Sequence, residues 1–344
     1  MQEEVISCRQ HGALALISLK RPAALNALSS IMIQKMDAGL KKWRENTSVK
    51  AILVEGEGRA FCAGADIVAA YKARQDFAAV VKYFEEEYEL DKYIGSYPKP
   101  YISYLDGIVM GAGAGISMHG SYRIATKNTV FAMPEAAIGL FTDAGAAVFL
   151  KSLPLPLRLY VCLSGARLNG SDCVRFGLAT HAMEEQNYPI LKDALSAGGP
   201  VEEILEKHCS ARLEEGLKPE ELSLISDCFS APRLTDCVRR VKNHVDEGNA
   251  FAKLILEALE KACPYSLQII FLSIHYGAKL SLPRWMDVEK KIVREVLSRS
   301  DFYEGVRAML IDKDHSPLWQ SQAELAEDEE KLADWFYRFV KDVR

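Results

Sequence analysis

The sequence predicts an α/β protein that is built from repeated strand–strand–helix units and ends in a helical region. Over residues 5–190, short apolar runs with strand character come in pairs, and a segment with helical spacing follows each pair. From about residue 202 onward the strand signals fade and amphipathic helical patterns dominate. Stacked repeats fit this recurrence better than a doubly wound sheet does. We therefore expect a core over residues 1–195 and a helical C-terminal region over residues 196–344.

Turns and periodicity locate the first units. A His–Gly turn separates alternating strands at residues 5–10 and 13–20, which predicts a hairpin. Residues 29–45 follow with apolar side chains every three or four positions, as an amphipathic helix requires. A strand at residues 49–55 then ends in a glycine turn.

Glycines mark the units in the middle of the chain. A short helix at residues 112–119 stops at Gly120 and separates two pairs of strands. We expect these strands at residues 101–105, 108–110, 122–125 and 130–132. A Gly-Gly-Pro run at residues 198–200 marks the boundary of the helical region. Helices are expected in that region at residues 250–262, 266–275 and 286–297.

Composition and charge restrict the class of protein. Of the 344 residues, 49% are hydrophobic, which is typical of a globular chain. The formal net charge of -5 is opposite in sign to the surface that binds nucleic acid, so no nucleic-acid partner is expected. The eight cysteines are scattered without a CxxC pair, which indicates reduced thiols and no metal site.

Two further features bear on where the protein works. The N-terminal residues run directly into strand-like sequence, without the pattern of a signal or transit peptide. The longest apolar runs are interrupted by Asp106, His119 and several glycines, so neither a membrane-spanning segment nor a membrane partner is expected. Together with the reduced thiols, these features predict a cytoplasmic location.

The run from Gly111 to Gly115 alternates glycine and alanine, follows a strand and enters a helix. It does not match the dinucleotide motif GxGxxG, and no lysine of a phosphate-binding loop follows it. One interpretation is close packing of the helix on a strand, which small residues permit. The other is an oxyanion site, because free N–H groups at a helix start can bind an oxygen that becomes negative.

A second turn of small residues occurs at residues 61–66, with the sequence FCAGAD, and a helix is expected after it. The amide of Ala65 is a candidate for a second donor to the same oxygen. Asp66 has a competing interpretation as the N-cap of the helix.

Two carboxylates follow the glycine run in apolar surroundings. Glu135 lies within FAMPEAAI, and Asp143 precedes AGAA. Burial makes a carboxyl group harder to ionise, which suits a group that transfers protons. Each residue also has a competing interpretation as a helix cap or first-turn residue. Combined with an oxyanion site, the pair predicts an enzyme that acts on a carbonyl group.

In this order, these segments resemble the enoyl-CoA hydratase/isomerase (crotonase) superfamily over essentially the whole chain. Residues 21–28 (RPAALNAL) resemble its first signature, and residues 61–66 and 111–115 resemble its two oxyanion segments. Residues 163–179 are similar to the helix–turn segment that closes the core. The resemblance implies a crotonase-like spiral of repeated ββα units with a helical C-terminal region.

Within the superfamily, residues 131–143 and 301–314 resemble the branch that hydrolyses short 3-hydroxyacyl-CoA thioesters such as 3-hydroxyisobutyryl-CoA. Hydratases of the superfamily use two glutamates, and one of them stands where this chain has Gly115, which cannot transfer a proton. Asp143 also matches the hydrolase branch, since hydratases usually have glycine there. The resemblance therefore implies an acyl-CoA thioester hydrolase of the valine-degradation type.

The resemblance implies a role for each candidate residue. The amides of Ala65 and Ala112 bind the thioester oxygen, while Glu135 attacks the carbonyl or activates water. Asp143 orients water or the 3-hydroxyl group. The positions implied to contact the acyl-CoA substrate are Glu87 in the acyl pocket and Ala24, Ala63, Asp66 and Ile67 along the CoA moiety. No cofactor is implied, because CoA belongs to the substrate, and a homo-oligomer is one option for the assembly.

Three positions near the acyl group depart from the superfamily pattern. Ala112 replaces a usual glycine and Thr142 replaces a usual proline. Ala144, together with Ala146 and Ala147, replaces a usual valine–glycine run. An alanine at position 112 would cost about 1–2 kcal/mol if the backbone there had a positive φ. Two alternatives to hydrolysis stay open. They are hydration or isomerisation of an enoyl-CoA, and acyl-CoA binding by a protein whose active site has decayed.

Overall fold

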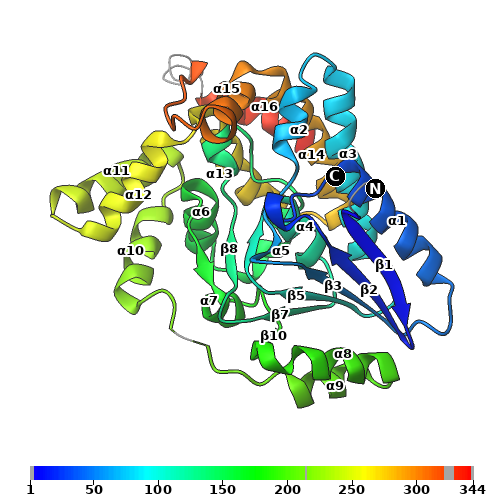
Figure 1. The fold of residues 1–344 in the computed structure, drawn as a ribbon. Coiled ribbons are helices and arrows are strands. Elements are labelled where there is room, and N and C mark those ends of the chain that lie inside the picture. The colour runs from blue at the N-terminus through cyan, green and yellow to red at the C-terminus, as the bar shows by residue number, and fades with distance from the viewer. Residues whose placement is uncertain (1–3, 214, 321–328, 342–344) are drawn as a thin grey trace. The chain divides into compact units, whose positions relative to one another are not determined.

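The computed structural model describes residues 4–213, 215–320 and 329–341 (Figure 1). The chain forms two compact units, each assembled from three stretches of sequence. The first comprises Met1–Asp66, Glu86–Phe131 and Leu168–Gly216, and the second comprises Ile67–Glu85, Ala132–Arg167 and Leu217–Arg344. The units interleave along the chain. The predicted division is instead a single cut between residues 195 and 196; it falls inside helix α8 (Tyr188–Ala197) and stays a prediction.

The first unit contains two sheets. The six-stranded sheet has the order β1 (Ile6–His11), β2 (Leu14–Leu19), β3 (Ala51–Gly56), β5 (Tyr101–Leu105), β7 (Tyr122–Ala125) and β10 (His181–Ala182). The four-stranded sheet has the order β4 (Ala60–Cys62), β6 (Ile108–Met110), β8 (Val130–Ala132) and β9 (Leu168–Asn169). β1 and β2 form the predicted antiparallel hairpin. From β2 to β10, the neighbours in the larger sheet are parallel.

Successive strands of one repeat join different sheets. β3 enters the six-stranded sheet and β4 enters the four-stranded one, and β5 with β6 and β7 with β8 divide in the same way. A strand therefore pairs with the equivalent strand of the next repeat, as Ile52 does with Tyr101. This arrangement confirms the predicted stacking of strand–strand–helix repeats.

Helices cover the larger sheet of the first unit. α8 and α9 (Val201–His208) lie against it in Figure 1, and Leu191 and Leu205 pack on Leu53 and Ile102 of the strands. Other helical segments that contribute to this unit are η1 (Pro22–Ala24), α1 (Ser30–Arg44), α3 (Phe77–Gly95), α4 (Ala112–Met118), α7 (Gly170–Arg175) and η4 (Glu185–Asn187). α3 supplies residues to both units.

Every residue of α4 is buried, and the glycines in and before this helix are required by close packing and by backbone conformation. A Cβ at Gly113 would lie 2.1 Å from the carbonyl oxygen of Cys62 at the end of β4. Gly111 precedes the helix with φ 50 and ψ -122, a conformation that glycine adopts far more easily than other residues. The packing interpretation of the glycine run is therefore correct for Gly113, and this packing is compatible with a free amide at Ala112.

The second unit is built from helices. α13 (Pro264–Gly277) is apolar on nearly all sides and is buried by α5 (Ala146–Phe149), α6 (Leu155–Ser164) and α16 (Glu329–Lys341). The remaining helical segments are α2 (Ile67–Lys72), η2 (Glu135–Ile138), η3 (Leu150–Ser152), α10 (Pro219–Phe229), α11 (Leu234–Asp246), α12 (Ala250–Lys261), α14 (Leu282–Ser298), α15 (Ser300–Val306) and η5 (Arg307–Ile311). The described residues from Val201 onward contain no strand, as predicted. No helix in the described part of the chain is both long and apolar enough to cross a bilayer.

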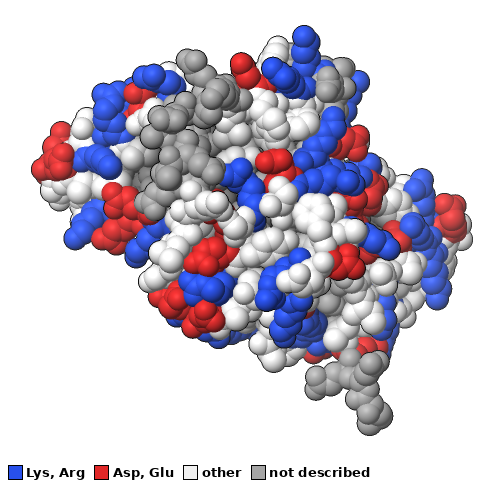
Figure 2. Space-filling model, turned by 90° about the horizontal axis from the view of Figure 1, so that it is seen from above, with Lys and Arg blue, Asp and Glu red and all other residues white. Residues whose placement is uncertain are grey.

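Charged side chains at the surface are partly neutralised by ion pairs. Arg307 contacts Glu304, Asp312 and Asp314 at 2.6–2.8 Å. Figure 2 shows Lys and Arg side chains interspersed with Asp and Glu side chains on the face seen from above. Exposed pairs of this kind each contribute about 0–1 kcal/mol, so they shape the surface more than they stabilise the fold.

Gly113→Ala should lower the temperature of unfolding, because the added methyl group pushes α4 away from β4. Overpacking of this kind typically costs about 1–3 kcal/mol. Calorimetry measures the change, with Gly39→Ala as the matched control. Gly39 lies inside α1, where an added Cβ would come no closer than 3.3 Å to its neighbours. Equal shifts for the two variants would contradict the tight contact at Gly113.

Candidate active site

Residues 21–28 brace the first predicted oxyanion segment within the first unit. The N–H of Ala63 donates to the carbonyl of Leu25 at 3.0 Å. The N–H of Leu28 donates to the carbonyl of Gly64 at 2.8 Å, and its own carbonyl accepts from the N–H of Asp66 at 3.1 Å. Three backbone bonds therefore hold the turn that carries Ala65 against a loop that precedes α1.

Side chains hold the same loop in shape. Asn26 is fully buried, and its amide nitrogen donates to the carbonyls of Glu57 and Ala60 at 3.0 and 2.7 Å. Arg21 forms an ion pair with Asp66 at 2.9 Å. Asp66 thus ties the turn to the loop, and its predicted contact with the substrate stays a prediction.

The two predicted oxyanion segments follow neighbouring strands. β4 and β6 are parallel, with Cys62 opposite Val109, so both strands end at the same edge of the sheet. Ala65 follows β4, and Ala112 follows β6 directly after Gly111. Within the described residues, neither amide N–H has a hydrogen-bond acceptor. Ala112 is not among the residues with positive φ, so its replacement of glycine causes no backbone strain.

The remaining predicted contact positions differ in exposure. Ala24 is exposed in the η1 turn, and Ala63 is half-buried. Glu87 on α3 is only 1% exposed and belongs to the first unit. Ile67 is the first residue of α2 and belongs to the second unit. Their contacts with a substrate stay predictions.

In the second unit, Glu135 begins the short turn η2, which two glycines bring close to α15. A Cβ at Gly139 would lie 2.5 Å from a backbone oxygen of α15, and a Cβ at Gly305 would lie 2.4 Å from the backbone of η2. The carbonyl of Ala136 accepts a hydrogen bond from the N–H of Cys263 at 2.9 Å. Backbone contacts with α13 and α15 therefore determine where Glu135 lies.

The surroundings of Glu135 disfavour its ionised form. The residue is 4% exposed, and its Oε2 has no hydrogen-bond partner among the described residues. Burial raises the pKa of Glu135 well above the usual range, and the nearby carboxylate of Asp143 raises it further. The backbone of its own turn and the hydroxyl of Thr142 lower the pKa, with a smaller effect. Such a group is suited to proton transfer or to attack on a bound carbonyl.

Asp143 begins a turn with an unusual backbone. It is 3% exposed, and the next two residues are left-handed, with φ 55 at Ala144 and φ 72 at Gly145. An alanine in this region costs about 1–2 kcal/mol, so the surrounding contacts must hold the turn. One such contact is the N–H of Gly145, which donates to both carboxylate oxygens of Glu289 at 3.0 and 3.2 Å.

The structure also shows which residues occupy the cap positions beside the two carboxylates. Pro134 occupies the N-cap position of η2, so Glu135 is a first-turn residue as well as a buried one. Gly145, not Asp143, occupies the N-cap position of α5. Asp143 contributes its backbone carbonyl, which accepts from the N–H of Ala146 at 2.9 Å. The cap interpretation of Asp143 is therefore wrong.

Sequence reasoning missed two residues that shape this region. Glu289 is fully buried. It could have been found in the sequence as a charged residue at helical spacing between Trp285 and Ile292, on the apolar face of a helix. Gly305 lies in a segment that the resemblance includes, but its close contact with η2 depends on a partner far away in the sequence. No local pattern could have shown that contact.

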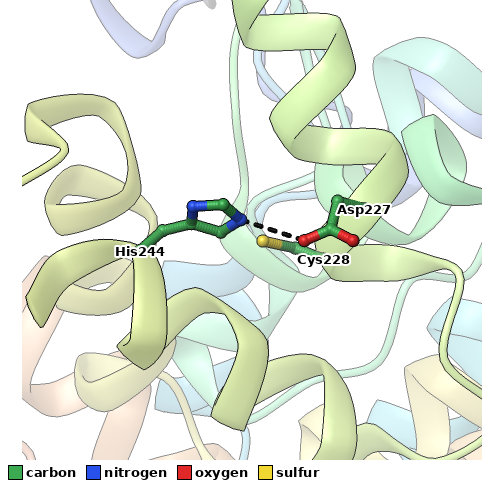
Figure 3. Close-up of side chains that lie close together, drawn as sticks. All are labelled: Asp227, Cys228 and His244. Atoms are coloured by element: carbon green, nitrogen blue, oxygen red, sulfur yellow. Dashed lines mark hydrogen bonds and ion pairs between the residues drawn. The ribbon is translucent and has the colours of Figure 1, made fainter. Parts of the chain in front are cut away.

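A cluster of potential metal ligands lies elsewhere in the second unit, on α10 and α11. The donor atoms of Asp227, Cys228 and His244 lie within 4.8 Å of one another (Figure 3). The ring nitrogens of His244 contact Asp227 at 2.9 Å and Glu247 at 3.2 Å. The bond to Asp227 raises the pKa of His244, and burial raises the pKa of the Cys228 thiol to about 12. Both ring nitrogens of His244 contact carboxylates, so we interpret the cluster as a polar contact between two helices.

Stacked strand–strand–helix repeats, together with two turns whose free amides end neighbouring parallel strands, define a class of protein. Residues 14–336 match the family described as enoyl-CoA hydratase/isomerase. The chain belongs to this family.

Individual relatives agree with that assignment. The chain is 39% identical to "3-hydroxyisobutyryl-CoA hydrolase, mitochondrial" of Gallus gallus, over 92% of this chain and 84% of the relative. It is 40% identical to the protein of the same name from Danio rerio, over 90% and 83%. Among solved structures, a carnitinyl-CoA dehydratase from Mycobacterium thermoresistibile superposes with a TM-score of 0.89 at 32% identity, over 97% of this chain and 96% of that chain. An enoyl-CoA hydratase from Rhodobacter sphaeroides gives a TM-score of 0.86 at 30% identity, over 96% of both chains.

Asp143→Asn should lower the pKa of Glu135, because it removes a carboxylate that raises this pKa and keeps the shape of the side chain. Infrared titration of the protonated carboxyl band measures the shift, with Glu135→Gln as the reference that lacks the band. Asp227→Asn removes an exposed carboxylate on α10 and should leave the titration where it is in the wild type. An unshifted band in Asp143→Asn would contradict the effect of the Asp143 carboxylate.

Proposed function

We propose that this protein hydrolyses the thioester of 3-hydroxyisobutyryl-CoA or of a closely similar short 3-hydroxyacyl-CoA. The curated relatives at 39% and 40% identity carry this substrate in their names. The observation that carries the proposal is the buried Glu135, whose pKa is raised by burial and by Asp143. Gly115, where hydratases have their second glutamate, removes the acid–base partner that hydration needs.

In the proposed reaction, the amides of Ala65 and Ala112 donate to the thioester oxygen. This oxygen becomes negative when a nucleophile adds to the carbonyl carbon. The carbon–sulfur bond then breaks, CoA leaves and takes up a proton, and the carbonyl carbon keeps an oxygen that comes from water. Loss of one oxyanion donor typically lowers kcat by about 10²–10³-fold. Because each donor matters this much, the presence of a free amide at both turns supports the proposed hydrolysis.

Glu135 and Asp143 supply the proton chemistry of this proposal. Glu135 either attacks the carbonyl carbon itself or removes a proton from the attacking water, and its raised pKa suits both roles. Asp143 orients water or the 3-hydroxyl group of the substrate, and Glu87 holds that hydroxyl or Glu135. A single turnover in ¹⁸O-labelled water separates the two roles of Glu135: label in its carboxylate identifies a nucleophile, and label in the product alone identifies a base.

The setting of the reaction is part of the proposal. We propose a cytoplasmic protein that needs no cofactor, binds acyl-CoA through Ala24, Ala63, Asp66 and Ile67, and has neither nucleic acid nor membrane as a partner. The named relatives are mitochondrial, so localisation by microscopy of a tagged full-length protein tests the compartment. Size-exclusion chromatography with light scattering tests the homo-oligomer.

Glu135→Gln should lower kcat for thiol release from 3-hydroxyisobutyryl-CoA by about 10²–10⁴-fold, because it removes the group that transfers the proton or attacks. Free thiol is followed with a disulfide reagent. Asp227→Asn is the matched control, since Asp227 is exposed and lies in the helix pair of Figure 3, and it should keep wild-type activity.

Two outcomes would replace the proposal. If the wild type releases no thiol from any short 3-hydroxyacyl-CoA but hydrates an enoyl-CoA, the protein is a hydratase. If wild type and Glu135→Gln bind CoA esters equally and neither turns them over, the protein is an acyl-CoA-binding protein with a decayed site.

A further inference from the structure

The proposed reaction does not use the carboxylate of Glu289. This carboxylate lies in a place where a charged group is energetically unfavourable. It is fully buried, and it lies on the face of α14 that also buries Trp285, Ile292 and Val293. A buried carboxylate persists only where hydrogen bonds compensate its lost hydration, and an apolar residue of similar size would usually serve packing as well or better. Its presence therefore needs a reason other than packing.

The partners of Glu289 indicate that reason. The N–H of Gly145 donates to both of its oxygens at 3.0 and 3.2 Å, and the indole N–H of Trp285 donates to one of them. Charge-assisted bonds of this kind are about twice as strong as bonds between neutral groups. Glu289 thus fixes one backbone amide that lies far away in the sequence, two residues after Asp143.

The amide that Glu289 binds belongs to a left-handed turn, which is closed by the bond from the N–H of Ala146 to the carbonyl of Asp143 and held further by the bond to Glu289. Ala144 and Gly145 both have left-handed backbone conformations. Glycine adopts this conformation at low cost, but alanine does not. Without an acceptor on Gly145, the turn can relax toward ordinary backbone angles, and Asp143 would rotate with it. Small displacements of a reacting group are sufficient to lower a rate by about 10²-fold.

We propose that Glu289 is a positioning residue for thioester hydrolysis: it binds the N–H of Gly145 and thereby holds the left-handed turn that orients Asp143. This inference rests on the proposed function. It predicts that Glu289 affects the rate of the reaction and not the affinity for CoA.

Glu289→Gln tests this role, because it keeps the shape of the side chain but loses the charge and one acceptor oxygen. We expect kcat for thiol release to fall by about 10–100-fold, with KM within about threefold of wild type. Amide exchange of the peptide that contains residues 143–149 should become faster. Trp285→Phe is the matched control: it removes a different donor to Glu289 and leaves Gly145 bound. It should lower the unfolding temperature and keep kcat within about twofold.

A double-mutant cycle separates positioning from general stability. If Glu289 acts through Asp143, Glu289→Gln should change kcat by less than about twofold in an Asp143→Asn background, since the group that it orients is already gone. An equal fold-change in both backgrounds, or a wild-type kcat in Glu289→Gln, would overturn the inference and leave the hydrolase assignment intact. Wild-type protein that releases no thiol would overturn the function and this inference with it.

Discussion

In the second unit the carboxyl group of Glu135 is buried away from water, and the proposed chemistry depends on that burial. A buried carboxyl group loses its hydration, so its protonated form is favoured and its charged form is reactive toward whatever binds beside it. The backbone supports this arrangement at close range: glycines at positions 139 and 305 allow η2 to approach α15, and Cys263 binds the carbonyl of Ala136. These backbone contacts determine where the carboxyl group lies.

The first unit meets a different requirement, the presentation of amides without partners. Buried backbone N–H groups are normally satisfied by helices and sheets, and an N–H left free at a strand end is available for a ligand. The parallel pairing of β4 with β6 sets the turns at Ala65 and Ala112 at one edge of the sheet. Gly113 keeps α4 close to Cys62, so the second turn follows its strand without a longer loop.

Much of the fold could be predicted from local patterns, and the contacts that build the site could not. Periodicity placed the hairpin, the strands of the middle repeats and the helices of the C-terminal region, because each depends on nearby residues. The role of Gly305 and the bond from Gly145 to Glu289 depend on segments far apart in the sequence. Resemblance to a family supplied the roles of Ala65, Glu135 and the other candidates, and the structure adds their burial and hydrogen bonds without testing those roles.

The division of each repeat between two sheets has a consequence for how the chain folds. Among the strands of the described residues, the hairpin of β1 and β2 closes the shortest loop, whereas pairs such as Ile52 with Tyr101 and Ile124 with His181 must first close long loops. Folding slows as contacts become less local, because the entropy of loop closure is lost before the contact forms. We therefore expect the hairpin to be protected first and the parallel ladders late. Pulse-labelling hydrogen exchange during refolding would show this order, or its absence.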